Sequence, residues 1–376
     1  MMLLSEEQIK LKEQFRKFVD QEIVPKSSSQ DRNEYLDEDM IHQLAKEGYL
    51  GAMIPKEYGG LGLDNVTIGM LNEEIGRGCS SVRSLLTVHG MVAIGIMRWG
   101  TAQQKSKWLP KMATGEVIGA FGLSEPNVGS DANGIETIAE NNGDHYTLCG
   151  MKKWITMGQC ADLYMVFAKV DGKSSAFLVE WKTKGFSREP INGLLGLRAS
   201  MTGILEFNSC KIPRDNLIGS EGTGISHVVH SCLDYGRFTV ACGCVGLGQA
   251  CLESCVNYAK DRRQFNAYIR ENQLIQKMVT EITVNVKAAR QLCYYAGSLR
   301  DKCDPESIIE TCIAKYFSSV MLSKIVNDTV QIHGANGCSN DFAVERYYRD
   351  AKMNEIIEGS TQMHEMMIAL NTFRSM

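Results

Sequence analysis

The feature that most constrains the fold is that strand-like segments are confined to one central stretch of the chain. Within residues 119–222, short runs such as LYMVFAKV and ILEFNSCKI are rich in β-branched and aromatic residues and are bounded by Gly, Asp, Asn or Pro. The flanking stretches carry apolar residues at helical spacing, as in the series Ile275, Met278 and Ile282. Because the strands do not alternate with helices, and because no GxGxxG motif occurs, the sequence argues against a Rossmann domain.

This order predicts a mainly α protein with a central antiparallel β domain. We expect an N-terminal helical domain at residues 1–118, a middle β domain at 119–222 and a C-terminal four-helix bundle at 223–376. The chain has 376 residues, of which 44% are hydrophobic, and this is enough for two or three substantial cores. At the N-terminus, the pattern SEEQ predicts a helix capped by Ser5 rather than a signal peptide.

Charge and cysteine content argue against several classes of function. The formal charge is −4 and no basic stripe occurs, so nucleic acid is not expected as a partner. Uninterrupted apolar runs are far shorter than the ~20 residues of a membrane span. The 13 cysteines form no CxxC pair, and we expect reduced thiols and a cytoplasmic protein. Cys251 and Cys255 could ligate a metal from one helix face, but no histidine or second cysteine pair completes a site, so no metal is expected.

Seven motifs follow one another between residues 55 and 360: PKEYGGLGLD, GTAQQKSKWLP, SEPNVGSD, KKWITMG, GLRASMTGILEF, VQIHGANG and YRDAKMNEIIEGS. In this order they resemble the acyl-CoA dehydrogenase family of flavoenzymes, and the resemblance covers essentially the whole chain. It implies an FAD-dependent oxidoreductase that acts on acyl thioesters and assembles as a homodimer or homotetramer. It also implies that FAD lies between the β domain, the C-terminal bundle and a neighbouring subunit.

The resemblance further implies which side chains contact the cofactor. Beside the flavin and pyrophosphate it places Phe121, Leu123, Ser124, Ser130, Trp154 and Thr156. Further contacts, in part to the FAD of a neighbouring subunit, are implied for Arg262, Phe265, Gln273, Gln331, Gly334, Ser360 and Gln362. Ordinary structural roles are the alternative: Trp154 could fill a β-domain core and Arg262 could cap a helix C-terminus, while the two helical glutamines could simply be solvated.

Glu358 stands between two isoleucines and a Gly–Ser step in the segment EIIEGSTQ. A carboxylate in apolar surroundings is costly to desolvate, and the loss of water raises its pKa. The resemblance identifies Glu358 as the base that removes a proton from the carbon beside the thioester carbonyl. The alternative is a buried glutamate paired with an arginine such as Arg349. A minority branch of the family carries its base near the start of the bundle, but the matching position here is Gly236, which cannot titrate.

Four residues are implied at the substrate by the same resemblance: Ser130, Asp234, Arg237 and Gly359. Ser130 would lie near the pantetheine arm that CoA and carrier proteins share, and Asp234 and Arg237 would contact the same arm. Gly359 lacks a side chain, so the backbone can approach both the ligand and the cofactor.

Three further stretches, LTVHGMVAIGIMRWGT, GCVGLGQACLESC and QIHGANGCS, are similar to a subgroup from polyketide and nonribosomal peptide pathways. Its members oxidise short acyl groups tethered to an acyl carrier protein, in making hydroxymalonyl, methoxymalonyl or aminomalonyl extender units. We therefore expect a dehydrogenase of a short, carrier-bound acyl thioester. Three departures from the family weaken the interpretation as an ordinary β-oxidation enzyme: Glu365 in place of arginine, Asn266 in place of glycine, and Ala335 in place of a second glycine.

Two other functions stay open from the sequence. A short-chain or branched-chain acyl-CoA dehydrogenase would use a CoA thioester, and a catalytically inactive scaffold would bind FAD without turning over. The electron acceptor would be an electron-transfer flavoprotein or oxygen. A carrier protein needs a basic rim, and KDRR at 260–263 and KSKWLPK at 105–111 are candidate surfaces, with solvated helix ends as the ordinary alternative.

Overall fold

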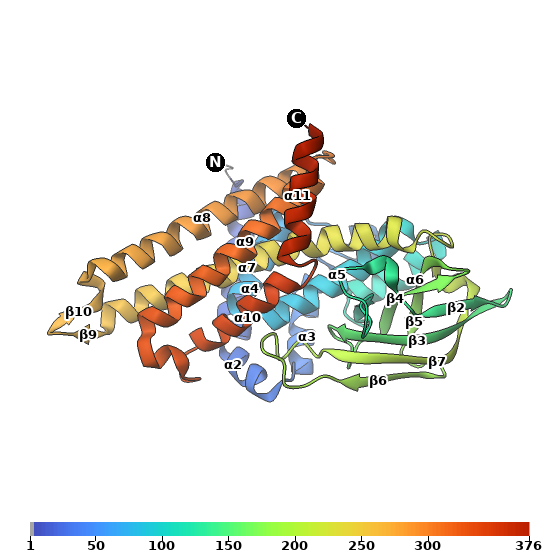
Figure 1. Ribbon diagram of the computed structural model, residues 1–376, viewed down its shortest axis with the longest axis horizontal. Helices are drawn as coiled ribbons and strands as arrows, with labels where there is room; N and C mark the ends of the chain where they lie inside the picture. The colour runs from blue at the N-terminus through green and yellow to red at the C-terminus, as the bar shows by residue number, and fades with distance from the viewer. Residues whose placement is uncertain (1–3, 376) are drawn as a thin grey trace.

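The computed structural model describes residues 4–375 and shows an elongated protein, helical at one end and built on a β-sheet at the other (Figure 1). Before the first strand the chain forms α1 (Glu6–Phe18), α2 (Val24–Asn33), α3 (Glu38–Lys46), α4 (Asn65–Gly78), α5 (Ser80–Trp99) and α6 (Ala102–Ala113). The predicted cap of α1 is confirmed. The Ser5 hydroxyl accepts a hydrogen bond from the Gln8 backbone, and the Gln8 side chain accepts one from the Ser5 backbone, both at 3.1 Å.

The middle of the chain builds one eight-stranded sheet. Its strands are β1 (Gly119–Gly122), β2 (Ile138–Asn141), β3 (His145–Ile155), β4 (Leu163–Val170), β5 (Lys173–Glu180), β6 (Phe186–Pro190), β7 (Gly203–Pro213) and β8 (Leu217–Ile218). Their order is β6-β7-β3-β2-β4-β5-β8, with β1 also paired to β4. Most pairs are antiparallel as predicted, but β4 runs parallel to both β1 and β2, so the sheet is mixed. The hairpin of β2 and β3 separates β1 from β4 along the chain, which lets β4 return in the same direction.

The C-terminal part is helical. It contains α7 (His230–Asp261), α8 (Gln273–Asp301), α9 (Ser307–His333), α10 (Val344–Ile356) and α11 (Thr361–Ser375). A small hairpin of β9 (Arg263–Gln264) and β10 (Ala267–Tyr268) joins α7 to α8 at the far end of the molecule (Figure 1). Both residues of its turn, Phe265 and Asn266, have positive φ, 51° and 63°, as a type I′ turn requires. Asparagine tolerates this conformation, so it can stand where glycine is usual in the family.

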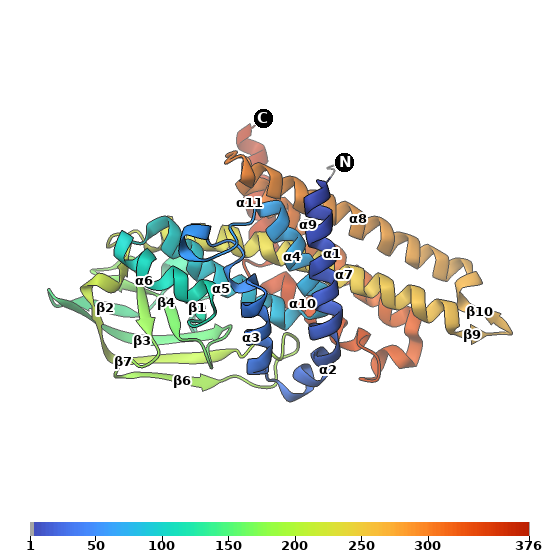
Figure 2. The same ribbon diagram turned by 180° about the vertical axis from the view of Figure 1, so that it is seen from behind.

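The N-terminal helices and the C-terminal bundle share one hydrophobic core, with α4 packed against α7 and α1 lying over α4 (Figure 2). Glycines allow the close approach of α4 and α7. A Cβ at Gly246 would lie 1.8 Å from the Glu73 carbonyl oxygen, and one at Gly76 would lie 2.7 Å from the Gly243 carbonyl oxygen. The domain boundaries at residues 118 and 222 therefore remain a proposal, because the helices that precede the sheet in the chain and those that follow it share one core.

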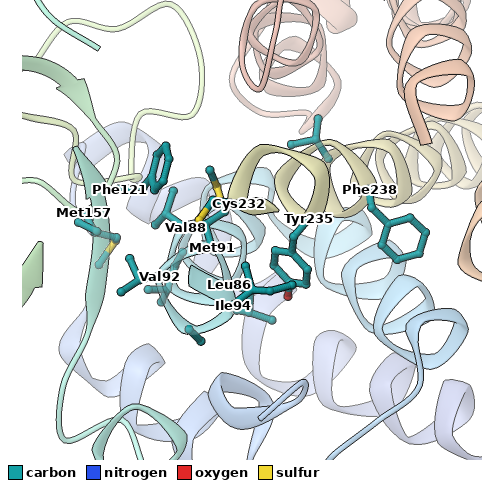
Figure 3. Packing of buried hydrophobic residues seen from close by; sticks show 14 of the residues in the cluster. Leu86, Val88, Met91, Val92, Ile94, Phe121, Met157, Cys232, Tyr235 and Phe238 are labelled. Atoms are coloured by element: carbon teal, nitrogen blue, oxygen red, sulfur yellow. The ribbon is translucent and has the colours of Figure 1, made fainter. Parts of the chain in front are cut away.

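Helix α5 connects the sheet to the bundle, and it is buried over nearly its whole length. It packs against β1 on one side and against α7 on another. Figure 3 shows Met91 of α5 between Phe121 on the sheet side and Tyr235 on α7. This helix therefore forms one wall of the space where the sheet, α7 and the C-terminal helices meet.

Two helical segments, Ser80–Trp99 and Gly224–Asp261, are long and apolar enough to cross a membrane by length and composition alone. Within the protein, 94% and 72% of their most apolar windows are buried, as in core helices. Uninterrupted apolar runs understate the hydrophobicity of these helices, because Gly, Ser, Thr and Cys are interspersed among the larger apolar residues.

Candidate active site

Glu358 lies in the turn that joins α10 to α11, with φ 55° in the left-handed region, and Gly359 follows with φ 96°. A glutamate in this region is strained, and such strain persists only where the surroundings enforce it. The turn directs the carboxylate at α7. A Cβ at Gly236 would lie 2.4 Å from Glu358 Oε2 and 3.0 Å from Met91 Sδ. Glycine at position 236 therefore leaves the room that the carboxylate occupies.

The Glu358 carboxylate has the properties of a base. Its Oε2 atom is buried and has no hydrogen-bond partner. Burial raises the pKa of Glu358 to about 7, although the positive charges of Arg237, Arg83 and Lys315 oppose this rise. A pKa close to neutral pH allows a group to be ionised and still bind a proton strongly, which is what general-base catalysis requires.

Arg349, the alternative partner of Glu358, is engaged elsewhere. Its Nη2 atom lies 2.6 Å from Asp31 Oδ2, and its Nε atom lies 2.8 Å from Glu345 Oε2. The interpretation of Glu358 as one half of a structural ion pair with Arg349 is therefore wrong.

Three cations from three helices act electrostatically on the carboxylate. Arg237 of α7 donates from Nε to the Glu358 carbonyl oxygen at 3.4 Å, and Lys315 of α9 donates from Nζ to the Gly359 carbonyl oxygen at 2.9 Å. These bonds hold the strained turn. Lys315 is fully buried, and burial lowers its pKa to about 8. The third cation, Arg83 of α5, is also fully buried.

Sequence reasoning did not identify Arg83, Lys315 or His364. The His364 ring packs on Gly359, its Nδ1 lies 2.9 Å from the Ser360 carbonyl oxygen, and its Nε2 is buried without a partner. A signal was present for the two cations, since each interrupts a stretch of small or apolar residues, SSVRSLL and TCIAKYFSS. A charge on the buried face of a helix is unusual enough to mark a functional position.

The residues predicted to bind substrate are only partly brought together. Arg237 and Gly359 adjoin Glu358 through the bonds just described. Asp234 lies one helical turn before Arg237 and pairs with Arg300 at 2.5 Å, while its Oδ1 atom is buried without a partner. Ser130 is exposed on the loop after β1.

The residues predicted to line the flavin gather at the edge of the sheet that faces the bundle. Phe121 and Leu123 are buried, and Ser124 and Thr156 are half-buried. Trp154 is 52% exposed with φ 66°, so it does not fill the β-domain core. The backbone nitrogen of Lys153 donates to the Ser124 carbonyl oxygen at 2.9 Å, which places Ser124 beside Trp154.

An exposed indole next to half-buried hydroxyl groups fits a flat aromatic ring with polar edges, such as a flavin. Ser360 and Gln362 stand at the start of α11, directly after the Glu358 turn. The donor set on this side of the molecule is therefore compatible with FAD.

A second group of predicted cofactor residues lies at the other end of the molecule. All its members are exposed: Arg262, Phe265, Gln273, Gln331 and Gly334. Arg262 is the backbone C-cap of α7, in keeping with the structural alternative, but its side chain also lines a pocket of about 540 Å³ with Tyr258 and His333. This end carries the β9–β10 hairpin, far from the sheet along the long axis (Figure 1). One copy of the chain therefore does not gather all the predicted contacts around one cofactor.

Comparison with known proteins bears on the whole chain. Models described as the N-terminal, middle and C-terminal domains of acyl-CoA dehydrogenase match residues 5–116, 120–210 and 222–372. The chain is 35% identical to a glutaryl-CoA dehydrogenase of Desulfococcus multivorans, over 98% of this chain and 97% of that protein. It is 36% identical to an acyl-CoA dehydrogenase of Bacillus subtilis, over 98% of each.

Solved structures agree with these matches. Butyryl-CoA dehydrogenase from Megasphaera elsdenii superposes with a TM-score of 0.96 at 32% identity, over 99% of this chain and 100% of that one. The prolyl acyl carrier protein oxidase AnaB gives 0.92 at 25% identity, over 98% and 100%. FkbI, described for biosynthesis of a methoxymalonyl extender unit, gives 0.89 at 29% identity, over 96% and 99%.

Proposed function

The chain belongs to the acyl-CoA dehydrogenase family, an FAD-dependent family of oxidoreductases, and we propose that it oxidises short acyl thioesters with Glu358 as the base. Bound FAD supplies the acceptor for a hydride from the second carbon after the thioester carbonyl. Glu358 takes the proton from the first carbon, so a carbon–carbon double bond forms between the two. Gly236 leaves space for the carboxylate, and Arg237 and Lys315 hold the backbone that carries it.

The observation that carries this proposal is the unpaired carboxylate oxygen of Glu358. It is buried, it accepts no hydrogen bond, and its backbone is held in a strained conformation. A purely structural glutamate would be paired, as buried carboxylates generally are. The same observation argues against the inactive scaffold, because a scaffold has no use for an unsatisfied buried carboxylate.

We also propose that the working enzyme contains at least two copies of the chain. One group of predicted cofactor residues includes Trp154, near the end of β3 that points toward the bundle (Figure 1). The other includes Arg262, which adjoins the β9–β10 hairpin at the far helical end of the molecule. A second copy that brings its β9–β10 end to the sheet of the first would complete each site. The exposed Phe265 and the pocket beside Arg262 would then face a partner rather than solvent.

The proposal has two candidates for the group that carries the acyl thioester, CoA and an acyl carrier protein. The curated relatives and the butyryl-CoA dehydrogenase structure support a CoA thioester, and they support it better than they support a carrier protein. Similarity to AnaB and FkbI supports a second candidate, in which the acyl group is bound to a carrier protein in an extender-unit pathway. The name of AnaB as an oxidase also favours testing oxygen beside an electron-transfer flavoprotein as the acceptor.

The test is anaerobic reduction of the bound flavin by one short acyl group presented on CoA and on an acyl carrier protein. Equal rates, or faster reduction by the CoA thioester at low salt, would establish an acyl-CoA dehydrogenase. Faster reduction by the carrier protein, with an advantage that shrinks as salt rises, would establish the second candidate, because rim charges act on encounter. If no short acyl thioester on either carrier bleaches the flavin, the proposed function is wrong.

A further inference from the structure

A fully buried ion pair, Lys152 with Glu125, lies in the β domain among the segments that carry the predicted flavin contacts. Lys152 Nζ lies 2.6 Å from Glu125 Oε1, and the two side chains are 0% and 1% exposed. Burial lowers the pKa of Lys152 to about 8, although Glu125 opposes this fall. Apolar side chains of similar volume are often as stable as a buried ion pair, so stability alone does not account for this one.

The Glu125 carboxylate joins the loop after β1 to the segment before β2. Its Oε1 atom accepts hydrogen bonds from the Thr137 backbone nitrogen at 3.0 Å and from Thr137 Oγ1 at 2.6 Å, and its Oε2 atom accepts one from the Glu136 backbone nitrogen at 2.5 Å. The Glu125 backbone also exchanges two hydrogen bonds with Val128. These bonds close the turn that leads to Ser130, another predicted cofactor contact.

The Lys152 ammonium joins the end of β1 to β3. Besides the carboxylate, it binds the Leu123 carbonyl oxygen, to which Nζ donates at 3.2 Å. The next backbone nitrogen, that of Lys153, donates to the Ser124 carbonyl oxygen at 2.9 Å. Leu123, Ser124 and Trp154 are all predicted to line the flavin, and each lies within two residues of one member of the ion pair along the chain.

The backbone that follows Lys152 is strained. Trp154 and Met157 have φ values of 66° and 58°, in the left-handed region, and the pairing of β3 with β7 shifts register between Lys152 and Ile155. Such strain persists only where the surroundings enforce it, and a shift of register changes the direction of nearby side chains. The Met157 backbone nitrogen is held by the Ser200 carbonyl oxygen at 2.9 Å. At the other end of the strained segment, the anchor is the Lys152 side chain.

We propose that Lys152 and Glu125 are positioning residues for the flavin. The ion pair sets the distance between the backbone at Leu123 and Ser124 and the strained segment at Trp154, and this fixes the surface on which the flavin ring lies. Both side chains are closed off from solvent, so they act on the cofactor through the backbone that they hold. The inference rests on the proposed function and adds these two residues to it.

The first measurement is the release of FAD from the holoenzyme, followed by the fluorescence of free FAD. In Lys152→Met, FAD should leave at least about 10-fold faster than from the parent, the size expected when a hydrogen bond from a charged group no longer holds the site. The visible absorption bands of the flavin that stays bound should also move, because the surface around the ring has changed.

The second measurement is a double-mutant cycle with Trp154. Trp154→Phe is made in the parent and in Lys152→Met, and the factor by which it accelerates FAD release is compared between the two. Because the ion pair acts through the segment that carries Trp154, this factor should be less than about half as large in Lys152→Met as in the parent.

Lys12→Met is the matched control, because it also breaks a buried lysine–glutamate pair. Lys12 lies 2.8 Å from Glu73 and joins α1 to α4, away from the predicted flavin contacts of the β domain. The control should lower the free energy of unfolding but leave FAD release and the flavin spectrum at the parent values, and its effect should add to that of Trp154→Phe.

A second variant keeps the test decisive if Lys152→Met does not fold. Glu125→Gln combined with Lys152→Met leaves no buried charge alone, so the cost of an uncompensated ion is absent. Because the bond to the Leu123 carbonyl oxygen is still lost, this variant should also release FAD at least about 10-fold faster than the parent.

The outcomes separate this inference from the proposed function. Release at the parent rate from Lys152→Met or from the double variant, or additive effects of Lys152→Met and Trp154→Phe, would overturn the positioning role. Equal acceleration in Lys12→Met would also overturn it, because the effect would then follow from any broken buried pair. A protein that holds no FAD, or whose flavin no short acyl thioester reduces, would instead overturn the proposed function.

Discussion

Two clusters of largely buried charged side chains differ in how completely their charges are paired. The paired cluster consists of Lys12, Glu73, Glu74, Arg77 and Arg290. Glu73 lies 2.8 Å from Lys12 Nζ and 3.0 Å from Arg290 Nε, and Glu74 lies 2.9 Å from Arg77 Nε. The unpaired cluster consists of Arg83, Arg237, Lys315 and Glu358, and within residues 4–375 it contains no ion pair.

The two clusters shift the pKa of a glutamate in opposite directions. Burial acts against ionisation of Glu73, but Lys12 and Arg290 outweigh it and lower the pKa. Burial dominates at Glu358 and raises its pKa to about 7. Within the paired cluster, Lys12 and Arg290 therefore favour the ionised form of Glu73 and join α1, α4 and α8, although burial and the charge of Glu73 raise the pKa of Glu74. The unpaired cluster keeps a carboxylate that can gain and lose a proton near neutral pH.

This difference separates a structural role from a chemical one. Paired buried charges contribute to one arrangement of helices, and breaking a pair leaves a charge without compensation. A buried carboxylate with no partner costs stability in the free protein, and it is retained where the cost serves function. A substitution in the unpaired cluster should therefore change the rate of flavin reduction, and a substitution in the paired cluster should change the free energy of unfolding.

The largest effect is expected for Glu358→Gln. The change is nearly isosteric and removes the base, so flavin reduction by a true substrate should slow by ~10²–10⁴-fold, as for the loss of a general base. The folded protein should be as stable as the parent or more stable, because the pKa of Glu358 shows that the fold favours its neutral form. Rapid mixing and thermal unfolding measure the two quantities.

Glu355→Gln is the matched control for that variant. Glu355 precedes Glu358 by three residues, pairs with Lys352 at 2.5 Å and accepts a hydrogen bond from Ser323 Oγ, so its carboxylate is engaged by other groups. It should leave the rate of flavin reduction within a few-fold of the parent. An unchanged rate in Glu358→Gln would show that another residue is the base, whatever the control does.

The opposite pattern is expected for Glu73→Gln in the paired cluster. Lys12 and Arg290 would lose their carboxylate, and the free energy of unfolding should fall by about 3 kcal/mol, the lower end for a broken buried pair because both cations keep some contact with solvent. Denaturant titration measures this loss. The remaining folded enzyme should reduce its flavin at the parent rate. A large loss of rate with unchanged stability would contradict the division between the clusters.

The sequence predicts the role of Glu358, but it does not predict the paired cluster around Glu73. Glu358 is visible because its motif is local and the residues that surround it in sequence are apolar. The partners of Glu73 come from α1 and α8, and the neighbours of Arg83 come from α7 and α10, so neither environment can be read from local pattern.

The fold shows the same limit. The order of helices, sheet and helices follows from periodicity, and the cap at Ser5 follows from its capping box. The parallel pairing of β1 with β4 and the shared core of α4 and α7 depend on contacts between distant segments. Glycine positions such as Gly236 acquire their meaning only when the opposing side chain is known.

The smallest effect concerns pH, and it tests whether the neighbouring cations tune Glu358. The base must be ionised, so the rate of flavin reduction at low substrate should rise with pH and level off above a step near 7, falling about tenfold per unit below it. His364 is not expected to produce this step, because burial lowers its pKa to about 4. In Lys315→Met the step should move to higher pH, since the charge of Lys315 lowers the pKa of Glu358.

The measurement is a pH series of rapid-mixing traces on the parent, on Lys315→Met and on Lys324→Met. Lys324 is an exposed lysine of the same helix, and its replacement should leave the step in place. A step that stays near 7 in Lys315→Met, or a shift to lower pH, would show that Lys315 holds the Gly359 backbone without acting on the charge of the base.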